Sequence, residues 1–141
     1  MFKTKVFVSF DFEKDRQYKY MLNAWSENSA FKFTFEDHSS GEIQSSGVSV
    51  VKNVLSRKIN EASAVIVIIG QDANKLHRDW REIGYRNWQN YEVAKAKELG
   101  KKLIAVQIDS RYQYPEELLD ANAMRVFGFR QVDIMRAIRG W

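Results

Sequence analysis

One predicted helix carries a single acidic side chain on an otherwise apolar face. Four residues at helical spacing make up that face: Trp88, Glu92, Ala96 and Leu99. A carboxylate on a face that packs against a sheet is costly unless it is paired or used in chemistry. A fixed carboxylate can stabilise the positive charge of an oxocarbenium-like transition state at a glycosidic bond. The alternative is structural, in which Glu92 lies at the margin of the face and reaches solvent, or pairs with Lys95 or a nearby arginine.

The elements around this helix predict a doubly wound α/β fold. Residues 64–69 (AVIVII) are apolar at every position, which is typical of a strand buried on both faces of a parallel sheet. The five predicted strands are residues 5–10, 31–35, 64–69, 103–108 and 125–129. Helical stripes alternate with them at residues 18–25, 48–62 and 88–99, and a last helix ends near Ile138. The sequence therefore predicts one flavodoxin-like domain over residues 1–141, a sandwich of about five parallel strands with flanking helices.

The loops of such a fold locate the candidate binding residues. Ligands bind beyond the carboxyl ends of the strands, at the point where the strand order reverses. Candidate residues therefore lie at 9–12, 37–41 and 70–74. Residues 37–47 are polar and rich in Gly and Ser, so they predict an unusually long loop. Residues 71–87 are polar and aromatic without a clear period, so the sequence predicts at most a short helix there.

Several classes of site are excluded by residues that the chain lacks. There is no cysteine, which excludes disulfides, a cysteine nucleophile and thiolate metal ligands. Only His38 and His77 occur and there is no HExxH motif, so we expect no metal site. The GxGxxG, GxxxxGK[ST] and GxSxG motifs are all absent, which argues against a dinucleotide fold, a P-loop and a nucleophile elbow. A phosphoacceptor receiver would need a carboxylate after the third strand, where Ile69 is followed by Gly70 and Gln71.

Composition and charge narrow the possible partners. The chain has 141 residues, of which 45% are hydrophobic and 28% charged, values typical of one globular domain. Its net charge of +4 is spread along the chain, so we expect an anionic small molecule such as a nucleotide and no nucleic acid. No run is long enough to span a bilayer and no signal-peptide core is present, so we expect a soluble, cytoplasmic protein without a membrane partner.

Four motifs occur in an order and at spacings that resemble a TIR (Toll/interleukin receptor) domain. They are VFVSFD at residues 6–11, AVIVIIG at 64–70, W-x-x-x-E-V-x-x-A at 88–96 and L-G-K-x-L-I-x-V at 99–106. Within that superfamily the chain is most similar to the bacterial TIR-like proteins of the Thoeris anti-phage system, over residues 5–138. It departs from the pattern at residues 71–87, an apparent insertion before Trp88. Trp80 offers no rival match, because Gly84 stands four residues after it.

The resemblance implies a reaction and a catalytic residue. Enzymatic TIR domains cleave the nicotinamide–ribose bond of NAD, and their catalytic glutamate matches Glu92. Nicotinamide leaves as a neutral molecule from a cationic pyridinium, so no general acid is required. Positive charge develops on the ribose instead, and one carboxylate beside it is sufficient.

The resemblance also implies the substrate-binding residues. Ser9, Phe10 and Asp11 at the end of the first strand line the nucleotide pocket, with Phe10 stacking on a flat ring or, alternatively, packing in the core. Asp37 lies in the loop that gates the pocket and mediates self-association in the family. Trp88 lies beside the site, where it packs so as to orient the glutamate.

The leading hypothesis is therefore an NAD-consuming enzyme of anti-phage defence. NAD is its substrate and no separate cofactor is implied. Its product, a linear or cyclic ADP-ribose-type signal, would activate a partner effector, and the enzyme would work as a homo-oligomer. One alternative is a non-enzymatic TIR-like interaction module that binds partners through residues 37–47 and the adjacent helices. Another is a nucleoside N-glycosidase of similar fold.

Overall fold

The computed structural model describes residues 4–28, 33–35 and 47–140. The candidate residue Asp37 lies outside this part of the chain, as does the loop predicted at residues 37–47 apart from Gly47.

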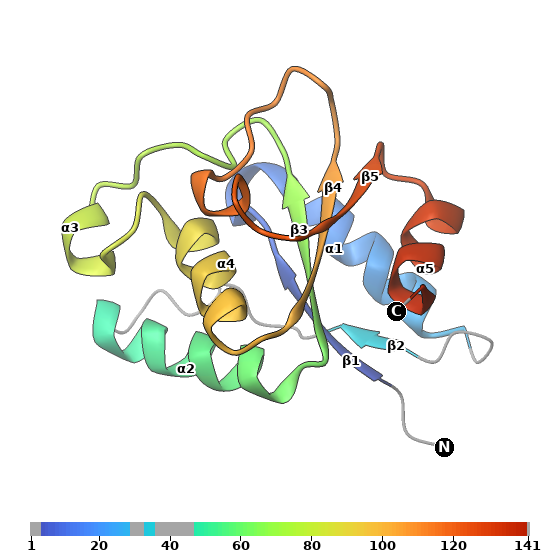
Figure 1. Ribbon diagram of the computed structural model, residues 1–141, viewed down its shortest axis with the longest axis horizontal. Coiled ribbons are helices and arrows are strands. Elements are labelled where there is room, and N and C mark those ends of the chain that lie inside the picture. Colours follow the sequence, from blue (N-terminus) through green and yellow to red (C-terminus); the bar gives the residue numbers. More distant parts are fainter. Residues whose placement is uncertain (1–3, 29–32, 36–46, 141) are drawn as a thin grey trace.

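A five-stranded parallel sheet forms the centre of the molecule, as the sequence predicted (Figure 1). Its strands are β1 (Thr4–Ser9), β2 (Phe33–Phe35), β3 (Ala64–Ile69), β4 (Lys102–Gln107) and β5 (Met124–Phe127). Their order is β2-β1-β3-β4-β5, and every neighbouring pair is parallel. This order is that of a flavodoxin-like sheet, so the predicted fold class is confirmed.

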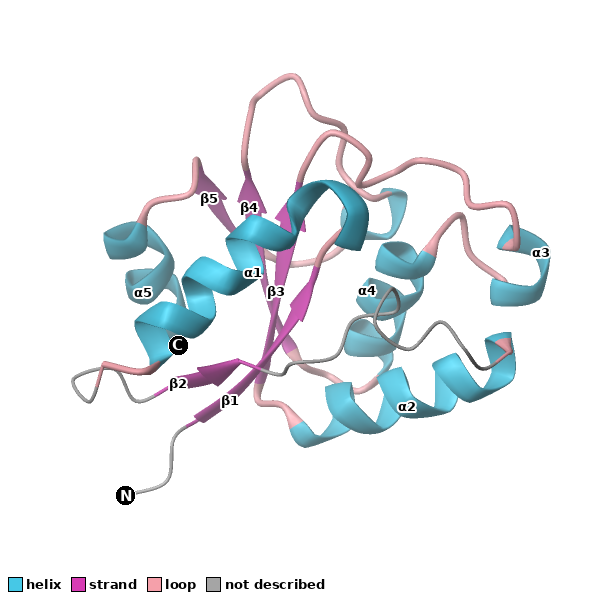
Figure 2. Ribbon diagram, turned by 180° about the vertical axis from the view of Figure 1, so that it is seen from behind, coloured by secondary structure: helices cyan, strands magenta, loops and turns pink. Residues whose placement is uncertain are grey.

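Helices cover both faces of the sheet. They are α1 (Phe12–Ser26), α2 (Val48–Glu61), α3 (Trp80–Ile83), α4 (Trp88–Glu98), α5 (Gln131–Arg139) and the short 3-10 helix η2 (Glu116–Leu118). Figure 1 shows α2, α3 and α4 on one side of the sheet and α1 and α5 on the other, and Figure 2 shows the same two layers from behind. None of the described helices is long and apolar enough to cross a membrane.

Strand alternation explains the two cores. In β1, Val6 and Val8 belong to the cluster that α1 and α5 cover, whereas Phe7 belongs to the cluster beneath α2 and α4. All six residues of β3 are buried, because this strand has a neighbour on each side and helices on both faces. The apolar run at residues 64–69 therefore predicted its position correctly.

Two predicted apolar stripes each include an exposed residue. Leu22 of α1 is fully buried, but Met21, one position away around the helix, is 45% exposed. Leu99 is 37% exposed because it lies just beyond α4. There the chain leaves the helix through Gly100, whose φ of +69° lies in the left-handed region that glycine tolerates.

The strand order places a crevice between β1 and β3. After β1 the chain passes to β2, on one side of the β1–β3 pair, and after β3 it passes to β4, on the other side. The two connections therefore diverge between β1 and β3. Such a switch point is where doubly wound folds bind ligands, beyond the carboxyl ends of the strands. The candidate residues that follow β1 and β3 are therefore brought together.

Candidate active site

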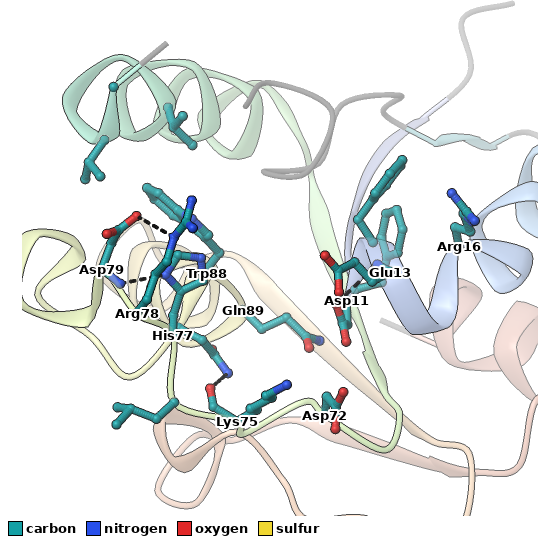
Figure 3. Close-up of a pocket in the computed structure, with 17 residues that line it drawn as sticks. Asp11, Glu13, Arg16, Asp72, Lys75, His77, Arg78, Asp79, Trp88 and Gln89 are labelled. Atoms are coloured by element: carbon teal, nitrogen blue, oxygen red, sulfur yellow. Dashed lines mark hydrogen bonds and ion pairs between the residues drawn. The ribbon is translucent and has the colours of Figure 1, made fainter. Parts of the chain in front are cut away.

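A pocket of about 880 Å³ lies at this switch point, large enough for a nucleotide-sized ligand. Its walls come from the residues that follow β1 and the first turns of α1, from the start of α2, from the segment after β3, and from the start of α4. Figure 3 shows polar and charged side chains from these elements around the cavity. The pocket thus combines parts of the chain that are distant in sequence.

Glu92 is buried behind this pocket. Its side chain is only 2% exposed, and Ser9 Oγ donates a hydrogen bond of 2.5 Å to Glu92 Oε1. Burial raises the pKa of Glu92 to about 8, although the Ser9 hydrogen bond lowers it in part. Both structural alternatives for Glu92 are wrong: it does not reach solvent, and no ion pair joins it to a lysine or an arginine among the described residues, since Lys95 pairs with Glu98 at 3.0 Å.

Neither member of the Ser9–Glu92 pair lines the pocket in this structure. Ser9 is fully buried and its hydroxyl is engaged by Glu92. The pocket wall includes instead Phe10, the first residue after β1, and Gln89, three residues before Glu92 on α4. The carboxyl group of Glu92 therefore lies behind the side chains that form the wall of the pocket.

Phe10 packs in the core, as one of the two alternatives expected, and it also lines the pocket. It is 4% exposed and belongs to the core cluster beneath α1 and α5. Its ring centroid lies 6.4 Å from that of Phe12, another pocket residue. A ligand ring that contacts Phe10 would therefore contact a residue that is already fixed by packing.

Asp11 links the pocket to the first turn of α1. Its side chain caps the helix by accepting a hydrogen bond of 3.3 Å from the backbone N–H of Glu13. Asp11 lines the pocket together with Asp72, which follows β3. Burial raises the pKa of Asp11, and the negative charge of Asp72 raises it further.

A second buried carboxyl group, Asp15, had no signal in the sequence. It is 5% exposed, and its Oδ2 has no hydrogen-bond partner among the described residues. The carboxyl group lies against Gly70, where a Cβ would overlap it. Burial, followed by the charges of Asp11 and Asp72, raises the pKa of Asp15 to about 7. Asp15 is buried in this way because α1 packs across the end of β3.

Trp88 both packs and lines the pocket. It is half-buried, and its ring meets the ring of Tyr91 edge-on at 5.6 Å. Tyr91 is in turn fixed by its hydroxyl, which lies 2.7 Å from Ser56 Oγ of α2. These contacts hold the start of α4, and with it Glu92, against α2.

Gln89 is a pocket residue that the sequence analysis missed. Its Nε2 donates hydrogen bonds to the backbone oxygens of Ile68, at 2.9 Å, and Ser9, at 3.3 Å. Its position between Trp88 and Glu92 was the one available signal, and a polar residue there is equally typical of a solvated helix face.

Residues 71–87 form one wall of the pocket. The short helix expected there is α3, and pocket residues precede and follow it. Charges of both signs face the cavity from this segment, among them Asp72, Lys75 and Arg78 (Figure 3). Within the part of the chain that the structure describes, no group of three or more acidic or histidine side chains is arranged to hold a metal ion.

The fold and the site together define a class of protein: a flavodoxin-like α/β domain with a buried carboxyl group behind a nucleotide-sized pocket at the switch point. Sequence comparison gives the family. The chain belongs to the family described as Thoeris protein ThsB, TIR-like domain, whose sequence profile matches residues 7–113. The resemblance to Thoeris TIR-like proteins is thereby confirmed.

Solved structures share the fold at low sequence identity. A CMP N-glycosidase of Clostridium botulinum, BcmB, matches with a TM-score of 0.60 and 14% identity, over 96% of this chain and 98% of that one. A prokaryotic SEFIR domain matches with a TM-score of 0.51 and 16% identity, over 98% and 89%. A 2-desoxiribosyltransferase from Leishmania mexicana matches with a TM-score of 0.50 and 15% identity, over 77% and 67%. A search of curated proteins found no match.

Proposed function

We propose that this protein cleaves the nicotinamide–ribose bond of NAD, with Glu92 as the catalytic residue. The observation that carries the proposal is the buried Ser9–Glu92 pair directly behind the switch-point pocket. The position of Glu92 in the W-x-x-x-E-V-x-x-A motif of a ThsB-family chain supports the same assignment.

The environment of Glu92 suits a cationic substrate. A carboxyl group with a pKa of about 8 is mostly protonated at neutral pH. The positive pyridinium ring of NAD beside it would favour the ionised form and release the proton. The carboxylate would then stabilise the positive charge that moves onto the ribose as neutral nicotinamide departs. Water, or a nucleophile within the substrate for a cyclic product, then bonds the same ribose carbon and loses its proton. Contact between the substrate and Glu92 requires side-chain motion in the pocket wall, because Glu92 itself does not line the pocket.

The remaining expectations belong to this proposal. Ser9, Phe10, Asp11 and Trp88 bind or enclose the substrate, and no separate cofactor takes part. The product is an ADP-ribose-type signal that activates an effector protein in the cytoplasm. A homo-oligomer, as TIR domains generally form, is the active state.

A second candidate is cleavage of a nucleotide N-glycosidic bond other than that of NAD. The structure of the Clostridium botulinum CMP N-glycosidase covers nearly the whole of both chains, and a fold of this kind therefore accommodates that bond type. The same carboxyl group would stabilise the same ribosyl cation, but the base would differ. A pure interaction module, the third possibility, leaves the burial of Glu92 without a role.

The decisive measurement is nicotinamide release from NAD by the purified protein, at low and high protein concentration. We expect release by the wild type and a loss of at least about 100-fold for Glu92→Gln, since one preorganised electrostatic group is worth that much elsewhere. Glu98→Gln is the matched control, because Glu98 is an exposed glutamate of the same helix. CMP and simple nucleosides are tested in parallel.

Each outcome selects one hypothesis. Release of nicotinamide that depends on Glu92 supports the NAD reaction. Release of a free base from CMP or a nucleoside, with NAD intact, supports the N-glycosidase. A protein that cleaves none of these at any concentration favours the interaction module.

A further inference from the structure

Gln89 closes the gap between the two strands at the switch point. The paired register of β1 and β3 ends at Ser9 and Val67. Beyond it, the side-chain nitrogen of Gln89 bonds the backbone oxygens of Ser9 and Ile68, one from each strand. The residue is 4% exposed, and Figure 3 shows its side chain extending from α4 toward Asp11.

The partners of Gln89 fix which way its amide group points. Backbone oxygens only accept hydrogen bonds, so the NH₂ group must face them and the side-chain oxygen must face away. No described residue donates a hydrogen bond to that oxygen. The Gln89 oxygen is not fully buried either, since Asp15 Oδ2 is the only fully buried side-chain nitrogen or oxygen without a hydrogen-bond partner among the described residues. The Gln89 oxygen is therefore an acceptor presented to the pocket.

Two of the charged residues that line the pocket, Asp11 and Asp72, are also acceptors, whereas Lys75 beside them is a donor. Asp11 and Asp72 line the same cavity, and Asp72 and Lys75 lie close enough to influence the charge of Asp11. A group with several hydrogen-bond donors suits this wall better than an anionic group. The hydroxyl groups of a ribose meet that requirement, and carboxylates hold ribose hydroxyls in other nucleotide-binding folds.

We propose that Gln89 is a ribose-binding and positioning residue: its oxygen accepts a hydrogen bond from a hydroxyl of the substrate's nicotinamide-side ribose, while its NH₂ group fixes Ser9 against Glu92. This inference rests on the proposed function, because it takes NAD as the ligand. It also connects substrate binding to catalysis. Gln89, which would bind the ribose, also bonds the backbone oxygen of Ser9, and the Ser9 hydroxyl bonds Glu92.

The test is equilibrium binding of NAD to the Glu92→Gln protein, in which turnover does not interfere. Gln89→Met removes both functions of the amide, and Gln89→Lys keeps donors for the two backbone oxygens but presents no acceptor. We expect both to weaken NAD binding about 3- to 10-fold, the equivalent of one hydrogen bond. Gln107→Met is the matched control, because Gln107 also donates to a backbone oxygen, that of Tyr112, but does not line the pocket.

Analogues of NAD that lack one hydroxyl of the nicotinamide-side ribose separate binding from a merely structural effect. For one of the two deoxy analogues, the Gln89 substitutions should cause no further loss of affinity. Equal losses for NAD and for both analogues would overturn the proposal, as would unchanged NAD binding by a folded Gln89→Lys variant or no NAD binding at all. Nicotinamide release by the wild type is scored separately, so a protein that binds NAD as described but never cleaves it refutes the proposed function and not this inference.

Discussion

The Ser9–Glu92 pair sets the chemistry at the scale of single residues. Burial makes the ionised form of Glu92 costly, and the Ser9 hydroxyl recovers part of that cost by donating to it. The result is a carboxyl group with a pKa of about 8, close enough to neutrality for a bound cation to change its charge state. Such tuning is typical of residues that act in catalysis.

The pH dependence of nicotinamide release follows from this value. Because the ionised carboxylate is the active form, kcat/KM should rise with pH through about 8 and level off above it. Ser9→Ala removes the hydrogen bond that favours ionisation, so its midpoint should lie at higher pH. The measurement is kcat/KM from pH 6 to 10 for both proteins.

The control for that experiment is Ser49→Ala, at an exposed serine of α2. It should reproduce the wild-type profile. A wild-type rate that falls as pH rises through 8 would mean that the protonated acid is the active form, which contradicts the proposed role of Glu92.

At the scale of elements, three buried or nearly buried asparagines hold the start of α4. Asn90 Nδ2 donates to the side-chain oxygens of Asn74 and Asn87 at 3.0 Å, and Asn90 Oδ1 accepts from the backbone N–H of Glu117 at 2.9 Å. Asn87 also caps α4 by accepting from the backbone N–H of Asn90. The network ties the segment after β3, the helix that carries Glu92, and η2 into one unit.

Asn90→Ala should therefore destabilise the protein by ~2–4 kcal/mol, because it leaves the partly buried Glu117 N–H without its hydrogen bond and removes two bonds to buried asparagines. Chemical unfolding monitored by circular dichroism measures the change. Asn53→Ala, at an exposed position of α2, should cost less than ~0.5 kcal/mol. A loss at Asn90 no larger than that at Asn53 would show that the network does not hold α4.

At the scale of the whole molecule, two buried carboxyl groups couple folding to pH. The pKa of Asp15 is raised from 3.8 to about 7 and that of Glu92 from 4.5 to about 8, so the folded state binds these protons more tightly than the unfolded state. Their contribution is fully present below about pH 4 and is lost as pH rises to about 8. The folded protein should therefore be less stable at pH 9 than at pH 5.

Asp15→Asn should remove part of this pH dependence. We expect it to reduce the difference in unfolding free energy between pH 5 and pH 9 by ~2–3 kcal/mol, since an amide at this position does not ionise. Asp133→Asn, on α5, serves as the control and should leave the difference unchanged. A variant that retains the full pH dependence would show that Asp15 is not the group responsible.

The elements could be predicted from the sequence because their signals are local. Period-two alternation and continuous apolar runs predicted the five strands, and period-3.6 stripes predicted the long helices; the wholly apolar run at residues 64–69 indicated a central strand. Glu92 was also found this way, since one acidic residue on an apolar helix face is visible in the spacing alone. These features depend on neighbours within a few turns of the chain.

The state of the site was decided by contacts between residues distant in sequence. Ser9 reaches Glu92 from 83 positions away, and Gln89 reaches Ser9 from 80. The burial of Asp15 depends on α1 crossing the end of β3 beside Gly70, which no local pattern records. The sequence by itself therefore determined the layers of the fold and the residue proposed for catalysis. Only the tertiary structure decided which side chains of the site are buried away from water, because desolvation and hydrogen bonding depend on how separate elements pack.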